Sequence, residues 1–498
     1  MSSLYALKVN SVYMRVECEA DVAHELWDHF AFEIPNAKHT PKVKSGQWDG
    51  LIRLFNPRSQ LMYIGLLEEL KQFCIDSDYA LEIDDRLLET TPFSEKVFDA
   101  FVANVLKLES KYVPRPAQKD AVLECIQNNR RVIISPTASG KSLIIYMLIR
   151  YYLNHPKVKG GKILLIVPAV SLVTQMFKDF QEYCSTFDVE QHVHTISAGD
   201  EKSSDKPIVI TTWQSIQNQP KPWFNDYRVV IVDETHRAKA AELKNILSNL
   251  VNADFRFGFT GTLDNIETNR MIITGLLGPV KQFVTTQELI DDKTLSNMNI
   301  EMVFLKYPYE VSRLLPGASY LDEMKFILPR EDRMKILSDY VQKQRGNTVV
   351  MYNLVETHGK PMFEYFQKHL KNKKLFFISG KIKPSVREEI RQFVQGGNEC
   401  VIVANYKVFA EGINLPRIHN IILGAPISTK TSEIAFLQSL GRGLRKDYDK
   451  DVINIVDLVD ENIIKNWKSH ATRHGLQRYL SYKKNFPNED MTITKLNV

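Results

Sequence analysis

From residue 131 onward, one hydrophobic pattern repeats along the chain. An apolar run is followed by a loop rich in Gly, Pro, Ser or Thr, and then by an amphipathic helix. Alternation of buried strands with helices is typical of a parallel sheet covered on both faces. The runs form two series, so we predict two doubly wound α/β lobes. The first series comprises 132–134, 163–167, 208–210 and 229–232, and the second comprises 348–351, 375–378, 400–403 and 421–423.

The first hundred residues follow a different pattern. Short strand-like runs alternate with two helical patterns, at 21–32 and 67–74. This arrangement predicts a small α+β domain. A polar, proline-interrupted stretch later in the chain fits a connection with inserted elements. We therefore predict an accessory, nucleic-acid-binding domain at 1–100, a first lobe at 101–288, the connection at 289–343, a second lobe at 344–460 and a basic helical extension at 461–498.

Composition narrows the class of protein. The 498 residues are 44% hydrophobic and 25% charged, which is ordinary for a globular protein and predicts roughly three folded units. The net charge of +5 is too small to indicate nucleic-acid binding by itself. No apolar run approaches the ~20 residues that span a bilayer, and no secretory signal is visible, so we expect a cytoplasmic protein without a membrane partner. The five scattered cysteines are expected to be buried thiols in a reducing compartment.

A phosphate-binding loop is the clearest chemical signal. Residues 135–142 follow an apolar strand and open an amphipathic helix, which is the setting such a loop requires. Lys141 would place a point charge on the β- and γ-phosphate oxygens of ATP, and the Ser142 hydroxyl would ligate Mg²⁺. Ser135 stands where the general pattern has glycine. The loop residues expected to wrap the phosphates are Pro136, Thr137, Ala138, Ser139 and Gly140.

Two adjacent carboxylates follow the strand at 229–232. Asp233 is expected to hold the Mg²⁺ shell, and Glu234 is expected to polarise the water that attacks the γ-phosphate. An acidic pair after a strand can instead cap the next helix. Its combination with Lys141 favours the nucleotide site.

With these motifs in order, the chain resembles a superfamily 2 helicase of the D-E-x-H type over nearly 340 residues. The resemblance implies two RecA-like lobes of the P-loop NTPase class. Upstream, Tyr112, Arg115 and Gln118 resemble the adenine-recognising segment, in which the Gln118 amide would read the base; a proline-rich interdomain turn is the alternative. Residues 258–262 resemble the motif that links the carboxylates to the second lobe, with a tight glycine turn as the alternative.

The second lobe carries the helicase pattern Q-x-x-G-R-x-x-R at 438–445. Gln438, Arg442 and Arg445 are expected to be catalytic. The spacing predicts that the two arginines project from one helical face, where a planar guanidinium could stabilise the γ-phosphoryl charge. Two arginines on a solvated face are the alternative. ATP would then lie between the lobes, and hydrolysis would open the cleft.

Residues 404–416 resemble the motif at which the second lobe contacts both nucleotide and nucleic acid. Glu411 and Gly412 lie at its centre and are expected to bind the nucleotide. Asn414 replaces the acid commonly found after the glycine. An amide keeps an acceptor but loses the charge, which puts a ribose or Mg²⁺-linked role for this position in doubt.

The resemblance also implies phosphate contacts on loops at one edge of both lobes. Each of these residues could instead cap a helix, which is the commoner role of Ser and Thr after a strand. The expected contacts are Pro168, Gln175, Thr211 and Thr212 in the first lobe, and Asn353, Ser379, Gly380 and Lys381 in the second.

Two basic segments outside the lobes also carry aromatic residues. The loop at 38–44 leads into Trp48 and Arg53, and could neutralise phosphates while Trp48 stacks on a base. A solvated hairpin with a core tryptophan is an equal alternative. The run at 465–484 is expected to dock as an amphipathic helix on the second lobe, with direct DNA contact as the alternative.

We therefore predict an ATP-dependent DNA motor. The order of segments resembles phage recombination and repair helicases, which implies unwinding of forks, Holliday junctions and R-loops, including an RNA–DNA hybrid, with 3′ to 5′ translocation. An RNA helicase and an ATP-gated DNA-binding or damage-recognition ATPase are the alternatives. A nuclease is disfavoured because no further acidic cluster has metal-ligand spacing. We expect a monomer that works in the host cytoplasm if phage-encoded, with single-strand-binding or recombination proteins as partners.

Overall fold

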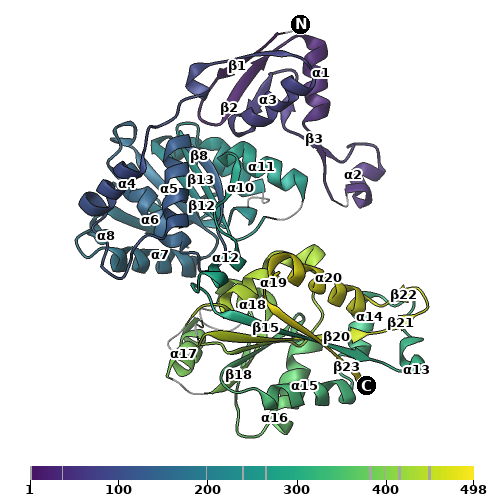
Figure 1. Ribbon diagram of the computed structural model, residues 1–498. Coiled ribbons are helices and arrows are strands. Elements are labelled where there is room, and N and C mark those ends of the chain that lie inside the picture. The colour runs from purple at the N-terminus through teal and green to yellow at the C-terminus, as the bar shows by residue number, and fades with distance from the viewer. Residues whose placement is uncertain are drawn as a thin grey trace. The chain divides into compact units, whose positions relative to one another are not determined.

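The computed structural model describes residues 3–35, 37–197, 199–237, 241–263, 266–380, 384–396, 399–412, 415, 417–446 and 450–498. The chain forms two compact units (Figure 1). The first contains Met1–Ser135 and Ser139–Val284, and the second contains Pro136–Ala138 and Thr285–Val498. Each unit is built around a seven-stranded sheet.

The N-terminal domain is a five-stranded sheet, ordered β5-β6-β2-β1-β7, with helices packed on it. Side chains alternate along β1, where Leu4 and Ala6 are buried and their neighbours are exposed. This period of two is the strand signal that the sequence carries. The strands of this sheet are β1 Ser3–Lys8, β2 Tyr13–Glu17, β5 Phe55–Asn56, β6 Leu61–Tyr63 and β7 Ala80–Ile83. A separate two-stranded sheet pairs β3 Ala31–Glu33 with β4 Leu51–Arg53. The helices are α1 Ala20–His29, α2 Pro41–Lys44 and α3 Leu67–Asp76.

The first parallel sheet has the order β10-β11-β9-β12-β13-β8-β14. Its central strands are almost entirely buried, because helices cover both faces of a parallel sheet. The strands are β8 Arg130–Ile134, β9 Lys162–Val167, β10 Val193–Ile196, β11 Ile208–Thr212, β12 Tyr227–Asp233, β13 Phe255–Thr260 and β14 Val280–Gln282. The helices are α4 Glu95–Phe101, α5 Pro116–Asn128, α6 Lys141–Leu153, α7 Val170–Tyr183, α8 Val189–His192, α9 Trp213–Ile216, α10 Ala241–Asn249 and α11 Glu267–Leu277.

The N-terminal domain and the first parallel sheet share one hydrophobic cluster. Their backbones meet at Gly65, where an added Cβ would lie 2.0 Å from the carbonyl oxygen of Thr274 in α11. Polar contacts reinforce the junction, because Asp254 accepts hydrogen bonds from Lys8 at 2.9 Å and from Ser11 at 2.7 Å. The first unit therefore includes the N-terminal domain as a packed part.

The second parallel sheet has the order β17-β18-β16-β19-β20-β15-β23. Its strands are β15 Asn297–Lys306, β16 Thr348–Tyr352, β17 Lys374–Ile378, β18 Cys400–Asn405, β19 Asn420–Leu423, β20 Val452–Glu461 and β23 Asp490–Asn497. The helices are α12 Thr286–Asp291, α13 Tyr309–Ser312, α14 Tyr320–Ile327, α15 Glu331–Lys343, α16 Lys360–His369, α17 Pro384–Gln395, α18 Tyr406–Gly412, α19 Thr429–Gly443 and α20 His470–Asn485, and a hairpin pairs β21 Ile463–Ile464 with β22 Trp467–Lys468.

The stretch that we expected to be a connection contributes a strand to this sheet. β15 pairs in parallel with β20 over its whole length and with β23 on its other side. The sequence between 289 and 343 also forms α14 and α15. The C-terminal extension supplies α20 and β23, so its last strand is part of the second sheet.

Helix α20 docks through a buried ion pair. The guanidinium of Arg478 binds the carboxylate of Asp457 at 2.8 and 2.6 Å, and both side chains are fully buried. Glu323 of α14 accepts hydrogen bonds at 2.8 Å from the first two backbone N–H groups of the helix, His470 and Ala471. These contacts hold α20 against the second sheet, as expected if the run at 465–484 docks as a helix on the second lobe.

Candidate nucleotide site and nucleic-acid contacts

The phosphate-binding loop joins β8 to α6, and its last glycine is fixed by its surroundings. Gly140 has a φ of +83°, and an added Cβ would lie 2.2 Å from the side-chain nitrogen of Gln118. Only glycine meets both conditions. Ala138 also has a positive φ, of 65°, which is costly for a residue with a Cβ. The loop therefore holds the tight backbone that a phosphate cradle needs.

Gln118 and Arg115 both hold this loop. The Gln118 amide nitrogen donates to the Ser139 carbonyl oxygen at 2.9 Å, and the Arg115 guanidinium donates to the same oxygen. The Gln118 amide oxygen accepts the Arg115 backbone N–H at 2.9 Å. Both ends of the amide that we expected to read adenine thus have partners within the chain. Tyr112 donates its hydroxyl to Glu182 at 3.0 Å and packs edge-on against Tyr183.

Lys141 lies between the loop and the acid pair. Its ammonium is 3.4 Å from Glu234 Oε1 and 3.3 Å from the Ser135 carbonyl oxygen. Glu234 has a φ of +56°, a strained conformation of the kind that clusters at functional sites. Burial would raise the pKa of Glu234, but Lys141 and His236 hold it well below its usual value. Glu234 is therefore an anion at neutral pH.

Asp233 ends β12 and is 7% exposed. Its Oδ1 accepts the Glu234 backbone N–H at 3.0 Å. Ser142, the second residue of α6, is half-buried beside the loop. A carboxylate and a hydroxyl are hard oxygen donors of the kind Mg²⁺ prefers, so these residues fit a magnesium ion. Within the described ranges, no three His, Cys, Asp or Glu side chains gather in a way that could hold a metal.

His236 is a site residue for which we predicted no role. Its Nδ1 lies 3.2 Å from Glu234 Oε2 and 3.0 Å from the Thr260 hydroxyl. The Thr260 hydroxyl in turn donates to the Thr262 carbonyl oxygen at 2.7 Å. His236 thus joins the acid pair to the segment at 258–262. The D-E-x-H motif, in which His236 is the fourth residue, was the sequence signal from which this role could have been predicted.

The arginines of the second unit do not share one helical face as we predicted. Gln438 and Arg442 lie four residues apart on α19, but this helix ends at Gly443. Arg445 lies beyond it and forms an isolated antiparallel bridge with Leu295. The Lys450 ammonium donates to the carbonyl oxygens of Gly443 and Arg445, which favours this helix end. Residue spacing alone could not locate the end of the helix.

Glu411 and Gly412 are the last two residues of α18. Their side-chain surroundings lie outside the described part of the chain, as does all of Asn414. Pro136 and Thr137 lie in the loop between β8 and α6.

The residues of the first unit that we expected to contact nucleic acid lie after β9, on α7 and at the end of β11. Pro168 is buried directly after β9, and Gln175 is exposed on α7. Thr211 is buried and donates to the Ile196 carbonyl oxygen at 3.2 Å. The Thr212 hydroxyl lies 3.0 Å from that of Ser215 at the start of α9. Both threonine hydroxyls therefore have local partners, but Thr212, at the N-cap of α9, makes no side-chain capping hydrogen bond.

In the second unit, Asn353 follows β16 and its carbonyl oxygen accepts the Asn405 amide at 2.7 Å. The Asn353 amide lies 3.4 Å from the Tyr320 hydroxyl. Ser379 is buried after β17, and Gly380 is exposed beside it. Lys381 lies outside the described residues.

Trp48 is held within the N-terminal domain. Its indole N–H donates to the Leu51 carbonyl oxygen at 2.9 Å. Arg53 pairs with Asp49 at 2.6 Å and stacks over Trp27 at 4.0 Å. The lysines of α2, Lys42 and Lys44, remain exposed.

A phosphate-binding loop and an acid pair on one parallel sheet, with a second parallel sheet in the same chain, define a P-loop nucleoside triphosphatase of helicase type. Comparisons with known proteins agree. Residues 7–84 match the family "DNA helicase UvsW, N-terminal", residues 111–265 match "Type III restriction enzyme, res subunit", and residues 332–447 match "Helicase conserved C-terminal domain". The chain is 33% identical over 494 residues to the ATP-dependent DNA helicase UvsW of Enterobacteria phage T4, which covers 95% of this chain and 96% of that one. The chain therefore belongs to the UvsW family of ATP-dependent DNA helicases.

Two further similarities support this assignment. The crystal structure of T4 UvsW superposes with a TM-score of 0.53 at 31% identity and covers 99% of both chains. The DNA 3′-5′ translocase XPB2 of Sulfurisphaera tokodaii is 23% identical over 409 residues, covering 75% of this chain and 85% of that one. The predicted superfamily 2 resemblance and the two-lobed α/β fold are confirmed. None of the described helices is long and apolar enough to cross a bilayer.

Proposed function

We propose that this chain is an ATP-driven motor that translocates on DNA and remodels branched DNA, including forks, Holliday junctions and R-loops. The observation that carries the proposal is the contact between the phosphate-binding loop and the acid pair. Lys141, Glu234 and His236 form one connected set, which reaches the segment at 258–262 through Thr260. A change at the γ-phosphate can therefore reach that segment directly.

We assign the steps of hydrolysis to residues of this chain. Lys141 binds the β- and γ-phosphate oxygens, and in doing so moves from the Glu234 carboxylate that it contacts here. Glu234, kept ionised, orients the attacking water and accepts its proton. Arg442 and Arg445 stabilise the charge of the γ-phosphoryl group, and Gln438 orients the nucleophile beside them.

Asp233 and Ser142 are the residues that we assign to hold magnesium. When bound, the ion neutralises the negative charge of the β- and γ-phosphate oxygens. The loop residues 136–140 enclose the phosphates through backbone N–H groups. Gln118 reads adenine only by exchanging its hydrogen bond to the Ser139 carbonyl for one to the base.

The assignment of the DNA contacts rests on the resemblance to the family and, apart from Gln175 on α7, on positions at or just after the ends of strands. Pro168, Gln175, Thr211 and Thr212 are assigned to one strand of DNA through its phosphates, and the second unit adds Asn353, Ser379, Gly380 and Lys381. Glu411 and Gly412 are assigned to the nucleotide. We also propose that the protein acts as a monomer in the cytoplasm, that of the host if it is phage-encoded, beside single-strand-binding or recombination proteins.

One experiment tests the function. A synthetic four-way DNA junction and a matched RNA duplex are given to the wild type and to the Glu234→Gln variant, and ATP hydrolysis and strand separation are measured together. We expect DNA-stimulated hydrolysis and junction unwinding by the wild type, and neither by the variant. Stimulation by RNA alone would identify an RNA helicase. Hydrolysis without strand separation would identify an ATP-gated DNA-binding protein.

A further inference from the structure

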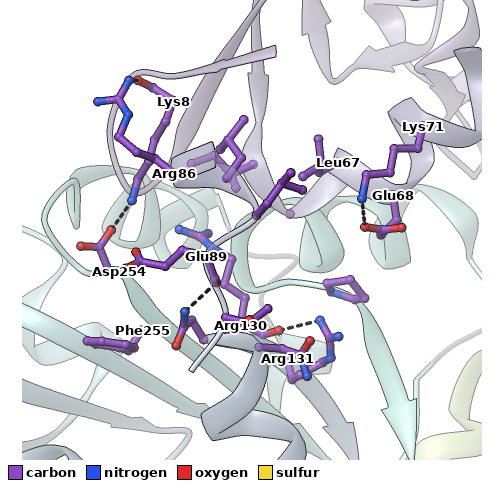
Figure 2. A pocket seen from close by; sticks show the side chains of 18 of the residues that line it. Lys8, Leu67, Glu68, Lys71, Arg86, Glu89, Arg130, Arg131, Asp254 and Phe255 are labelled. Atoms are coloured by element: carbon purple, nitrogen blue, oxygen red, sulfur yellow. Dashed lines mark hydrogen bonds and ion pairs between the residues drawn. The ribbon is translucent and has the colours of Figure 1, made fainter. Parts of the chain in front are cut away.

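A pocket of about 440 Å³ lies where the N-terminal domain packs on the first parallel sheet (Figure 2). Its walls come from α3, from the segment 84–90 that leaves the N-terminal domain, and from the first residues of β8 and β13. All of these residues belong to the first unit. The volume falls within the ~300–1,000 Å³ typical of small-ligand sites. Neither the nucleotide site nor the predicted DNA contacts use any of its lining residues.

Contacts across the junction hold the walls in place. The Arg130 guanidinium donates to the Ser11 carbonyl oxygen at 2.6 Å, and Lys8 pairs with Asp254 at 2.9 Å. The close backbone approach at Gly65 fixes the neighbouring wall. The pocket is therefore part of the packed domain junction.

Positive charge exceeds negative charge around the pocket. Six cationic side chains line it against three carboxylates, which leaves an excess of three positive charges. Two of the six are balanced from outside the lining, because Arg86 pairs with Asp84 and Arg131 pairs with Glu124. The six are Lys8, Lys71, Arg86, Arg130, Arg131 and Lys157.

Arg130 is the cation without a carboxylate of its own. No described residue forms an ion pair with it, and its buried Nη1 has no hydrogen-bond partner within the described chain. Burial lowers the pKa of Arg130 to about 10, against the opposing effect of Asp254, so the side chain is still charged at neutral pH. Arg130 is half-buried, and a guanidinium nitrogen that is buried without a partner is costly; an anion at this wall would relieve that cost.

Part of the pocket lining is apolar. Leu87 and Leu88 of the segment 84–90 contribute to this apolar surface together with Pro279, and Leu88 is 46% exposed. An apolar ledge beside a cluster of guanidinium and ammonium groups suits a planar ring that carries a phosphate.

We propose that this pocket binds a nucleotide unit, with its phosphate near Arg130, Arg86 and Lys157 and its base on the apolar ledge. The unit comes either as a free nucleotide or as a nucleotide of a DNA strand. Strand β8 begins in the pocket at Arg130 and ends at Ile134, directly before the phosphate-binding loop. The inference goes beyond the proposed function, because this site lies at the other end of β8 from the ATP site.

Calorimetric titration of deoxyadenosine monophosphate into the full chain tests the proposal. A saturating non-hydrolysable ATP analogue is present to fill the ATP site. We expect one binding event in the wild type, weakened about ten-fold or more when two charge-assisted contacts are removed in Arg86→Ser/Lys157→Ser. Both side chains are exposed, so this variant should fold. Lys159→Ser, an exposed lysine in the same loop, is the matched control and should bind like the wild type. Basal ATP hydrolysis should be unchanged in both variants.

Two further probes identify the source of the nucleotide. If a 5′-phosphorylated single-stranded oligonucleotide competes with the monophosphate, and does so less well in the double variant, the ligand is a nucleotide of DNA. If it does not compete, the ligand is the free nucleotide. Absence of monophosphate binding at millimolar concentration would overturn the proposal. Equal affinity for inorganic phosphate, or equal affinity of the double variant, would overturn it as well.

Discussion

The ammonium of Lys141 lies 3.4 Å from the carboxylate of Glu234, although the two residues are 93 positions apart in the chain. The contact joins the loop that we propose binds phosphates to the carboxylate that we propose acts on water. The two opposite charges lie close enough to neutralise each other. In the proposed mechanism, the phosphates of ATP take the place of Glu234 beside Lys141, and the carboxylate is then available to act on water.

Replacing Lys141 with alanine should abolish ATP turnover. The β- and γ-phosphates lose their point charge, whereas the predicted DNA contacts lie on other loops. Salt-sensitive DNA binding should persist, and a titration at two ionic strengths beside an ATPase assay checks both effects. Lys159→Ala is the matched control. Unchanged turnover in Lys141→Ala would contradict the site assignment.

Arg445→Ala should slow hydrolysis far more than it weakens ATP binding. Loss of a guanidinium that acts on the transition state costs on the order of 10³-fold in rate. Because Arg445 lies beyond the end of α19, the substitution leaves the helix itself intact. Single-turnover kinetics together with nucleotide titration separate the two effects. A pure binding defect would rule out the assigned role.

Acid should destabilise the second unit through His358. This residue is buried, and burial, with a smaller contribution from Arg333, lowers its pKa to about 4. The unfolded chain binds a proton near pH 6.5, but the folded chain does not, so stability falls as the pH drops from about 6.5 to about 4. At pH 5 the loss from this residue is about 2 kcal/mol. Half-buried His474, with a pKa also lowered to about 4, acts in the same direction.

Urea unfolding at pH 7.5 and pH 5.0 measures this dependence. His358→Gln should show a smaller difference in unfolding free energy between the two pH values than the wild type. His369→Gln, at an exposed position, should show the same difference as the wild type. Equal pH sensitivity in all three proteins would exclude His358 as the source.

Asp457→Asn should weaken the docking of α20. The substitution leaves the fully buried Arg478 guanidinium without its counter-charge, and breaking a buried pair from one side costs about 3–5 kcal/mol. Thermal unfolding should report the loss, and proteolysis should cut sooner near α20. Asp451→Asn, whose side chain is 89% exposed, is the control and should be neutral.

Gly65→Ala should weaken the packing of the N-terminal domain against α11 of the first unit. The added Cβ would lie 2.0 Å from the Thr274 carbonyl oxygen and 2.7 Å from that of Gly275, and both are backbone atoms that cannot turn aside. Overpacking of this kind costs about 1–3 kcal/mol. Limited proteolysis of the segment 84–90 measures the opening. Gly380→Ala, where the nearest atom is 4.0 Å away, serves as the control for stability.

The nucleotide motifs could be predicted because their signals are local. An apolar strand, a short loop and a helix start are contiguous around Lys141, and Asp233 directly ends a buried strand. The strand β15 could not be placed in this way. Its partners, β20 and β23, come from far later in the chain, and the prolines around it favoured a connection. Pairing over such a distance leaves no local pattern in the sequence.

The detailed contacts of the candidate site could not be predicted from the sequence either. The end of α19 before Arg445 depends on Lys450 and on the bridge to Leu295. The contact of Gln118 with the Ser139 carbonyl depends on how α5 packs against the loop. Residue type and spacing identify such groups, but tertiary packing determines which atoms they meet.

The placement of β15 between β20 and β23 has a consequence for how the protein is made. During synthesis, β15 leaves the ribosome with neither of its neighbours and keeps two open edges until both have emerged. The second sheet therefore closes late, while the first unit can fold earlier from residues that have already been translated. The apolar residues of β15 need protection during this interval, which makes this strand the segment of the newborn chain where a chaperone would act or aggregation would start.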